Sequence, residues 1–310
     1  MEELDRDFAR GIDAYCSWLT YERNYSAHTV RAARSDLESF GRWAGRKGLD
    51  PFRLTLRQVR GFLAELDRAQ YARSTINRRL STLRRFFGYA QTFGLCEANP
   101  VAALQGPKQP RTLPAVLRRA DMEKLLAVHA AVGPDGKPRE QTPADLRDQA
   151  LLELLYASGL RVSEAAGLDV KDVDLSQGQA RVMGKGSKER IVPLHATAVA
   201  AIAEYLERGR PVLAVKPGES RLFLSSRGNP LTADAIRRMF KESLRAAELD
   251  ESLSPHAVRH TFATDVLDGG ADLRSVQEML GHASLSTTQI YTHLTPSRLL
   301  SAHAQAHPRA

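Results

Sequence analysis

The sequence has no run of about 18 uninterrupted apolar residues, which is the length that a membrane-spanning helix needs. Its first residues, MEELDRDFAR, are charged where a secretion signal would be apolar, so we expect a cytosolic protein. The only two cysteines, Cys16 and Cys96, are 80 positions apart and form no CxxC pair. A disulfide framework and a zinc knuckle are therefore not supported, and two buried thiols are the simpler interpretation.

The usual motifs of metal-dependent chemistry are also missing. The sequence contains no HExxH motif, no paired-aspartate motif and no Cys/His array, and such ligand sets are what zinc, magnesium and calcium sites require. We therefore expect no metal and no other cofactor. The composition, with 43% hydrophobic and 26% charged residues over 310 positions, is that of a globular chain of roughly two domains rather than a disordered polycation.

The positive charge is unevenly distributed. The formal net charge is +8, with 18 basic and 12 acidic residues before Arg111 and 26 basic and 24 acidic residues from there on. Residues 57–85 contain eight arginines against Glu65 and Asp67 only. Such a patch suits a polyanion, because neutralising phosphates releases counterions, although a solvated helix face explains it equally well. The candidate DNA-binding residues are Arg73, Arg78, Arg79, Arg84 and Arg85.

Residues 1–104 are predicted to form a helical domain. Thr55 and Gln58 have the spacing of a capping box, Ser74 is expected to cap the next helix, and Gly94 is expected to end it. Apolar residues recur at helical spacing and predict one buried face, which leaves the neighbouring arginines outside or at its flank. The buried positions are Ile76, Leu80, Leu83 and Phe87, and the outer ones are Arg78, Arg79 and Arg85.

A proline-rich segment, residues 105–114, predicts a stiff linker before a second domain of residues 115–310. Thr142 followed by Pro143 predicts a helix start, and the polar residues 133–143 look like a surface insertion. Residues 179–194 alternate apolar and polar side chains around a glycine-rich turn, which is typical of a β-hairpin, with Lys185 in the turn. Further helices are predicted over 120–131, 145–158, 196–208, 233–247, 255–268 and 273–280.

Three segments of the second domain carry residues suited to phosphodiester chemistry. They are SGLRVSE with Arg161, SPHAVRH with His256 and Arg259, and the segment from His282 to Tyr291, nine residues later. Because His256 and Arg259 are three positions apart on a predicted helix, both can point at one ligand, and a phosphodiester fits that pair better than a metal does.

Cleavage without a metal needs cations, a nucleophile and an acid. Two arginines can offset the charge of the transition state, Tyr291 can attack phosphorus, and Lys185 can protonate the leaving 5′-hydroxyl. His256 could take the tyrosine proton or bind a phosphate oxygen. Taken singly, each residue also fits an ordinary structural role, such as pairing of Arg161 with Glu164. Their combination in this order favours the catalytic interpretation.

That ordered set resembles the tyrosine recombinases, and the sequence around it resembles that of their Xer subgroup, the bacterial chromosome-dimer resolvases. The matching strings are LLELLYASGLRVSEAAGLDVKDVDL, VMGKGSKERIVPL, LSPHAVRHTFAT, GADLRSVQEMLGHASLSTTQIYTHL and HPRA. The resemblance covers essentially the whole chain. It implies catalytic roles for Arg161, Lys185, His256, Arg259, His282 and Tyr291, a supporting role for Glu164, and structural roles for His260 and His293.

For the fold, the resemblance implies a mainly α protein with a small β component. A helical SAM-like core-binding domain and an α+β catalytic domain would form a two-domain C-shaped clamp around double-stranded DNA. It further implies a heterotetramer with a related Xer-type subunit, a possible DNA translocase as activator, and a last helix, residues 296–306, that docks onto a neighbouring protomer.

The function implied is resolution of chromosome dimers and plasmid multimers at cell division through a 3′-phosphotyrosyl intermediate, here as the C-type subunit. Strings typical of the D-type subunit also occur, so a D-type subunit or a phage or mobile-element integrase stays open. A non-catalytic architectural DNA-binding protein and a type IB topoisomerase-like relaxing enzyme are the alternatives from other classes.

Overall fold

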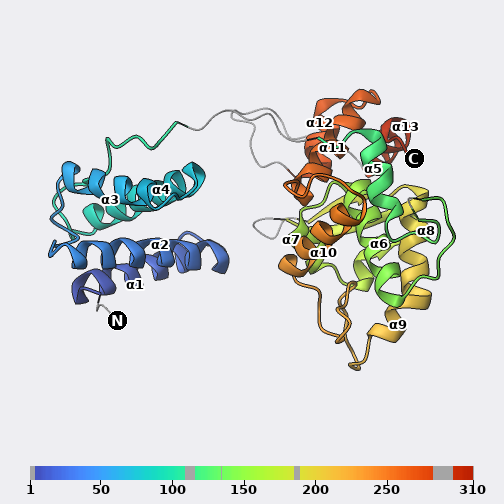
Figure 1. The fold of residues 1–310 in the computed structure, drawn as a ribbon, viewed down its shortest axis with the longest axis horizontal. Helices are drawn as coiled ribbons and strands as arrows, with labels where there is room; N and C mark the ends of the chain where they lie inside the picture. Colours follow the sequence, from blue (N-terminus) through green and yellow to red (C-terminus); the bar gives the residue numbers. More distant parts are fainter. Residues whose placement is uncertain (1–3, 109–115, 134, 185–188, 282–295, 310) are drawn as a thin grey trace. The chain divides into compact units, whose positions relative to one another are not determined.

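The computed structural model describes residues 4–108, 116–133, 135–184, 189–281 and 296–309. The chain forms two compact units, Met1–Thr112 and Leu113–Ala310, each with its own hydrophobic core (Figure 1). Helices predominate in both units, and the described residues contain one sheet of three short strands. The mainly α fold with a small β component is therefore confirmed.

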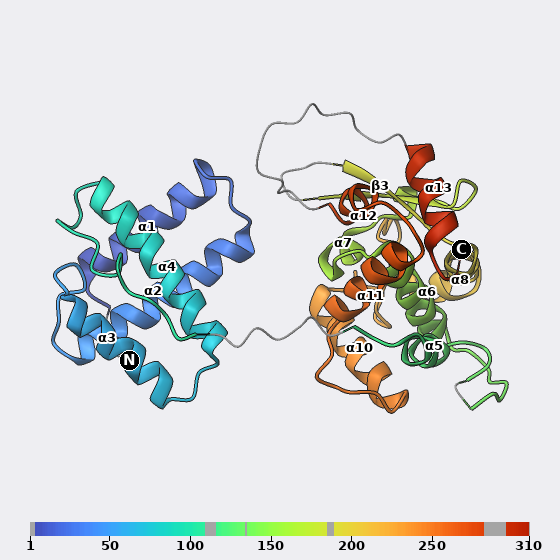
Figure 2. The same cartoon turned by 90° about the horizontal axis from the view of Figure 1, so that it is seen from above.

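The first unit is a bundle of four helices that cross one another (Figure 2). Although aromatic residues make up only 6% of the sequence, they fill this core. The rings of Phe8 and Phe86 meet edge to face with centroids 5.3 Å apart, and those of Phe40 and Phe62 at 5.1 Å. The helices are α1 (Arg6–Tyr21), α2 (Ala27–Arg46), α3 (Leu56–Arg68) and α4 (Arg73–Thr92).

Capping residues set most helix starts in this unit. Thr55 and Gln58 form the predicted capping box of α3, and Gly94 follows the end of α4 with a φ of 72°. The prediction that Ser74 caps α4 is wrong. The helix begins at Arg73 with Ala72 as its N-cap, so Ser74 lies inside the first turn.

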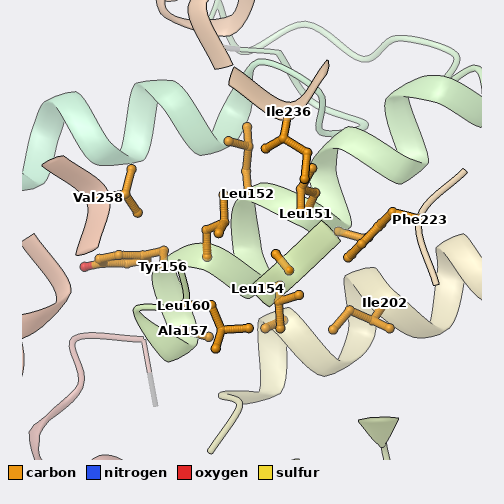
Figure 3. Close-up of a cluster of buried hydrophobic side chains, with 14 of the residues drawn as sticks. Leu151, Leu152, Leu154, Tyr156, Ala157, Leu160, Ile202, Phe223, Ile236 and Val258 are labelled. Carbon is orange, nitrogen blue, oxygen red and sulfur yellow. The ribbon is translucent and has the colours of Figure 1, made fainter. Parts of the chain in front are cut away.

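The second unit is built around α6 (Pro143–Ser158), whose side chains from Leu146 to Ser158 are buried except for the half-buried Gln149. Figure 3 shows its leucines directed at Ile202, Phe223 and Ile236 from other segments of the unit. A helix buried on nearly every side lies in the middle of a core, and its charged residues Arg147, Asp148 and Glu153 are buried with it. Thr142 caps it with Pro143 at its first position, as predicted.

Other elements surround α6. The strands are antiparallel in the order β1-β2-β3, with Ala180 opposite Val192, which confirms the predicted hairpin strands. The first helix of the second unit, α5, ends at Ala127 and is shorter than the predicted range of 120–131. The chain turns after it, and the side chain of His129 contacts those of Asp145 and Ser243 at 3.1 and 2.8 Å. The elements are α5 (Arg119–Ala127), α7 (Val162–Gly167), η1 (Val170–Asp172), β1 (Val173–Asp174), β2 (Gln179–Met183), β3 (Glu189–Pro193), α8 (Ala196–Glu204), η2 (Tyr205–Gly209), α9 (Arg210–Leu213), α10 (Ala233–Ala246), α11 (Pro255–Asp268), α12 (Leu273–Leu280) and α13 (Pro296–Ala306).

Candidate active site

The turn between α6 and α7 carries Arg161. Gly159 caps the end of α6 with a φ of 58°, which suits glycine, and a Cβ there would lie 2.4 Å from the ring of Phe262. Leu160 is buried next, and Arg161 becomes the N-cap residue of α7. The turn therefore has little freedom, because a glycine, a buried leucine and a helix start define it within three residues.

Glu164 on α7 holds Arg161 in place. One carboxylate oxygen accepts the backbone N–H of Arg161 at 2.8 Å, and the other accepts its Nη1 at 2.9 Å. The side chain of Glu164 is 7% exposed, whereas that of Arg161 is 38% exposed. The arginine is thus anchored from the protein side while part of its guanidinium stays open to solvent, where a ligand can reach it.

Arg259 on α11 is buried beside this pair. Its Nη1 donates to the Gly159 carbonyl and its Nη2 to the Leu280 carbonyl, both at 2.6 Å. Burial, with Arg161 and Arg190 nearby, lowers the pKa of Arg259 to about 10, so the group stays protonated at neutral pH. Each terminal nitrogen carries a second N–H, which suits an anion brought to the site.

His256 lies one turn before Arg259, in the first turn of α11, and is exposed. Partial burial, followed by the positive fields of Arg259 and neighbouring cations, lowers its pKa below the ordinary value. The imidazole is therefore neutral at physiological pH and can accept a proton or a hydrogen bond. Among the predicted catalytic residues, the structure brings together Arg161, Arg259 and His256.

Arg190 on β3 also belongs to this group and was missed from the sequence. Its Nη1 and Nη2 donate to the two oxygens of Glu164 at 2.9 and 2.8 Å, and its Nε donates to the Met279 carbonyl at 2.9 Å. The only sequence signal was its place on the hairpin strand that follows Lys185. Three arginines from separate chain segments therefore surround one carboxylate.

The other predicted catalytic residues, Lys185, His282 and Tyr291, lie outside the described residues. The chain leading to two of them is described. Met183 ends β2 two residues before Lys185, and Gly281, with a φ of 64°, closes α12 directly before His282. Their roles stay predictions.

The candidate DNA-binding arginines of the first unit have partners within the protein. Arg78 and Arg79 both pair with the buried Asp36, and the Arg79 guanidinium lies 4.5 Å from the centroid of the Tyr71 ring. The side chain of Arg79 is 14% exposed, so of the two predicted places, outside or at the flank of the buried face, it lies at the flank. Three others bond backbone carbonyls: Arg73 to Lys108, Arg84 to Leu104 and Arg85 to Ser81.

The last helix, α13, packs on its own catalytic unit. His303 Nε2 lies 2.8 Å from the Ala157 carbonyl, and Arg309 pairs with the buried Glu153 at 2.9 Å. In the single chain, α13 therefore has its partners on α6, and the docking of this helix onto a neighbouring protomer stays a prediction. An exchange between protomers would have to break these bonds and remake them.

Within the described ranges, no three His, Cys, Asp or Glu side chains come together in a way that could hold a metal ion. None of the described helices is both long and apolar enough to cross a lipid bilayer.

Comparisons with known proteins identify the family of the chain. Residues 115–298 match the phage integrase family, and residues 12–92 match the phage integrase N-terminal SAM-like domain. Tyrosine recombinase XerC of Oceanobacillus iheyensis is 41% identical over 96% of this chain and 96% of its own. Tyrosine recombinase XerD of Yersinia pestis is 43% identical over 96% of this chain and 97% of its own.

Solved structures show the same fold. A lambda integrase dimer bound to a COC′ core site has a TM-score of 0.64 at 21% identity and covers 92% of this chain and 99% of that one. The Tn1549 transposon integrase has a TM-score of 0.68 at 19% identity, over 88% and 92% of the two chains. The chain belongs to the phage integrase family, the tyrosine recombinases, which are DNA strand-transferring enzymes.

Proposed function

We propose that this recombinase cuts and rejoins DNA at a specific site through a 3′-phosphotyrosyl intermediate. The observation that carries the proposal is the convergence of Arg161 and Arg259 from α7 and α11 around the end of α6, with Glu164 and His256 beside them. A cluster of cations with open N–H groups is suited to a phosphodiester, whose charge increases in the transition state. In this proposal the arginines supply that stabilisation without a metal ion.

In the proposed reaction, the phosphate is transferred from the 5′-oxygen of the DNA to Tyr291. The Tyr291 oxygen forms a bond to phosphorus while the bond from phosphorus to the 5′-oxygen breaks. The phenolic proton passes to the neutral His256, and Lys185 gives a proton to the departing 5′-oxygen. Arg161, Arg259 and His282 bind the non-bridging oxygens. Reversal with a different 5′-hydroxyl rejoins the strand.

Trapping a covalent adduct tests the proposal. Wild-type protein with chromosomal DNA fragments from its own organism, in the presence of that organism's related recombinase and EDTA, should give a protein–DNA adduct that survives SDS. Tyr291→Phe should give none, and Tyr21→Phe, at an exposed position in the first unit, should behave as wild type. The proposal fails if the wild-type protein forms no adduct or if Tyr291→Phe forms one.

Within the family we propose the C-type Xer role, the resolution of chromosome dimers and plasmid multimers in a cytosolic heterotetramer with a D-type subunit. Relatives of both names match at similar identity, 41% and 43% in the two cases above, so a D-type role is the nearest alternative. Mapping the adducts separates the roles. Adducts confined to one chromosomal site and dependent on the partner subunit support an Xer role, and cleavage of opposite strands by the two subunits shows which protein cuts which.

Other outcomes would favour other functions. Adducts at a phage or transposon end without a partner subunit would favour a mobile-element integrase, and site-independent relaxation of supercoils would favour topoisomerase-like activity. DNA binding that is unchanged in Tyr291→Phe, without any adduct from the wild type, would leave an architectural role. A C-shaped clamp and activation by a DNA translocase stay predictions.

A further inference from the structure

Arg190 joins three elements at the candidate active site. It sits on β3 opposite Val182 of β2, one pair before Met183 and Glu189, the last paired residues on either side of the segment that contains Lys185. Its two terminal nitrogens bond the carboxylate of Glu164 on α7, and its Nε bonds the last turn of α12 at Met279. Arg259 also bonds both of the segments that lead to Arg161 and to His282, but through the carbonyls of Gly159 and Leu280, whereas Arg190 bonds the carboxylate that holds Arg161.

The contact is buried and closely packed. The side chain of Arg190 is 13% exposed, and a Cβ on Gly281 would lie 3.1 Å from its Nη1. A side chain at the residue before His282 would therefore crowd the guanidinium. Glycine suits this position because of that close approach and because α12 ends there with a φ of 64°.

Glu164 depends on this arginine. Burial alone would favour the neutral acid, but hydrogen bonds from Arg190 and from the backbone of Arg161 hold the pKa of Glu164 below its ordinary value. A two-pronged arginine fixes the plane of a carboxylate, whereas a single donor leaves it free to rotate. Because Arg161 is bonded to the same carboxylate, the direction of its guanidinium follows from that plane.

We propose that Arg190 is a positioning residue for strand cleavage. It orients Arg161 through Glu164, and it holds the end of α12 close to the Glu164 carboxylate. The rate prediction below rests on the proposed function, and the exchange measurement after it does not. Arg190 itself touches no reacting atom in this role. Its loss should leave DNA binding in place and slow the chemical step.

The first experiment measures single-turnover adduct formation at saturating DNA. Arg190→Gln should slow it by about 100-fold, the cost of a misplacement of roughly 1 Å at a reacting centre, with DNA affinity within about threefold. Arg190→Lys keeps the charge but not the fork and should recover less than half of that loss on a logarithmic scale. The control is Arg245→Gln, which removes an exposed two-bond pair with Glu251 and should change little.

Two further experiments distinguish the positioning of Arg161 from other roles that Arg190 could have. The double variant Arg190→Gln/Glu164→Gln should be no slower than the slower single variant, because both act on one path. With a substrate whose bridging 5′-oxygen is replaced by sulfur, the leaving group needs no proton, so the deficit of Arg190→Gln should persist. Wild-type rate in Arg190→Gln, additive losses, or full rescue by the sulfur substrate would each overturn the proposal, the last by showing action through Lys185.

Hydrogen exchange supplies a measurement without DNA. In Arg190→Lys and Arg190→Gln, amides of residues 160–164 and 279–281 should exchange at least about tenfold faster, with α6 and the first unit unchanged. Unchanged exchange in both segments overturns the proposal even if no adduct is ever formed. Conversely, faster exchange with no wild-type adduct would show that Arg190 holds these two segments in place, while refuting the proposed function.

Discussion

The two units use arginine in different ways. In the first unit the arginines of α4 lie along one helix, and each finds a partner nearby, such as Asp36 for Arg78 and Arg79. In the second unit Arg161, Arg190 and Arg259 come from three distant segments and meet around Glu164. The unit with the smaller excess of basic residues therefore holds the tighter cluster of positive charge.

This difference shows that many positive charges along one helix and a few positive charges brought together from separate segments are distinct properties. A run of arginines along one helix is visible in a sequence, but the salt bridges and carbonyls of the fold engage much of it. Convergence depends on which loops and helix ends meet, and it places cations where solvation is poor and their field is strong. The predictions below test that distinction, beginning with the largest effect.

Arg259→Lys should have the largest effect on chemistry. A single ammonium cannot bond both the Gly159 and Leu280 carbonyls and also reach a phosphate, so adduct formation should fall by roughly 10²–10³-fold. Arg84→Lys in the first unit, which alters one bond to the Leu104 carbonyl, should cleave within a few-fold of wild type. Similar losses in both variants would remove the contrast between the units.

Glycine substitutions should act with opposite signs in the two units. Gly159→Ala combines a φ of 58° with a Cβ 2.4 Å from Phe262 and should destabilise the second unit by about 3 kcal/mol. Gly61→Ala, in the middle of α3 with its nearest neighbour at 3.9 Å, should stabilise the first unit by about 0.5–1 kcal/mol.

The two units can be followed separately in urea, because both tryptophans, Trp18 and Trp43, lie in the first unit. Tryptophan fluorescence reports that unit, and circular dichroism reports both. Equal shifts of the two transitions in Gly159→Ala would contradict the prediction that its strain is confined to the second unit.

Acid should destabilise the second unit selectively. Burial lowers the pKa of His195 and His307 to about 3 and that of His303 below its ordinary value, so all three are neutral when folded. The unfolded chain binds protons below about pH 6.5, so stability is full above that pH and falls by up to about 1.4 kcal/mol per unit for each histidine as pH decreases. The first unit contains only the exposed His28.

Urea unfolding between pH 7.5 and 5.5 checks this expectation. Fluorescence midpoints should stay nearly constant while the transition of the second unit moves to lower urea. His303→Gln should make that pH dependence shallower, and His28→Gln should not change it. Glu153, whose pKa is raised by burial, works in the opposite direction at the acid end of this range. An identical pH slope in His303→Gln would show that the buried histidines do not cause it.

The smallest effects should distinguish arginines of α4 that bind DNA from those that stabilise the first unit. Arg85→Gln, at an exposed position bonded only within its own helix, should weaken DNA binding to all sequences alike and reduce the slope of log K against log salt by about 1. Arg79→Gln should instead lower the stability of the first unit by about 1 kcal/mol, since it loses contacts with Asp36 and Tyr71. Loss of binding to one sequence only in Arg85→Gln would indicate base recognition.

Local features were predictable because local chemistry decides them. The capping box at Thr55, the helix start at Thr142 and the glycine stop at Gly94 were predicted from neighbouring residues and are confirmed. One local prediction was wrong: Ser74 is not a cap, because α4 starts one residue before it. Distant residues decide what local chemistry could not predict, such as the pairing of Arg79 with the buried Asp36 of another helix.

The sequence by itself determined the class of protein, the order of its proposed catalytic residues and most helix boundaries, because spacing and caps act over a few residues. Only the tertiary structure decided that Arg190 joins Glu164 to the end of α12, that much of the arginine patch serves the first unit, and that α13 rests on its own domain. These contacts join residues 20 to 146 positions apart. Which of many possible partners a charged side chain meets at such separations depends on how the buried helices of each unit pack together.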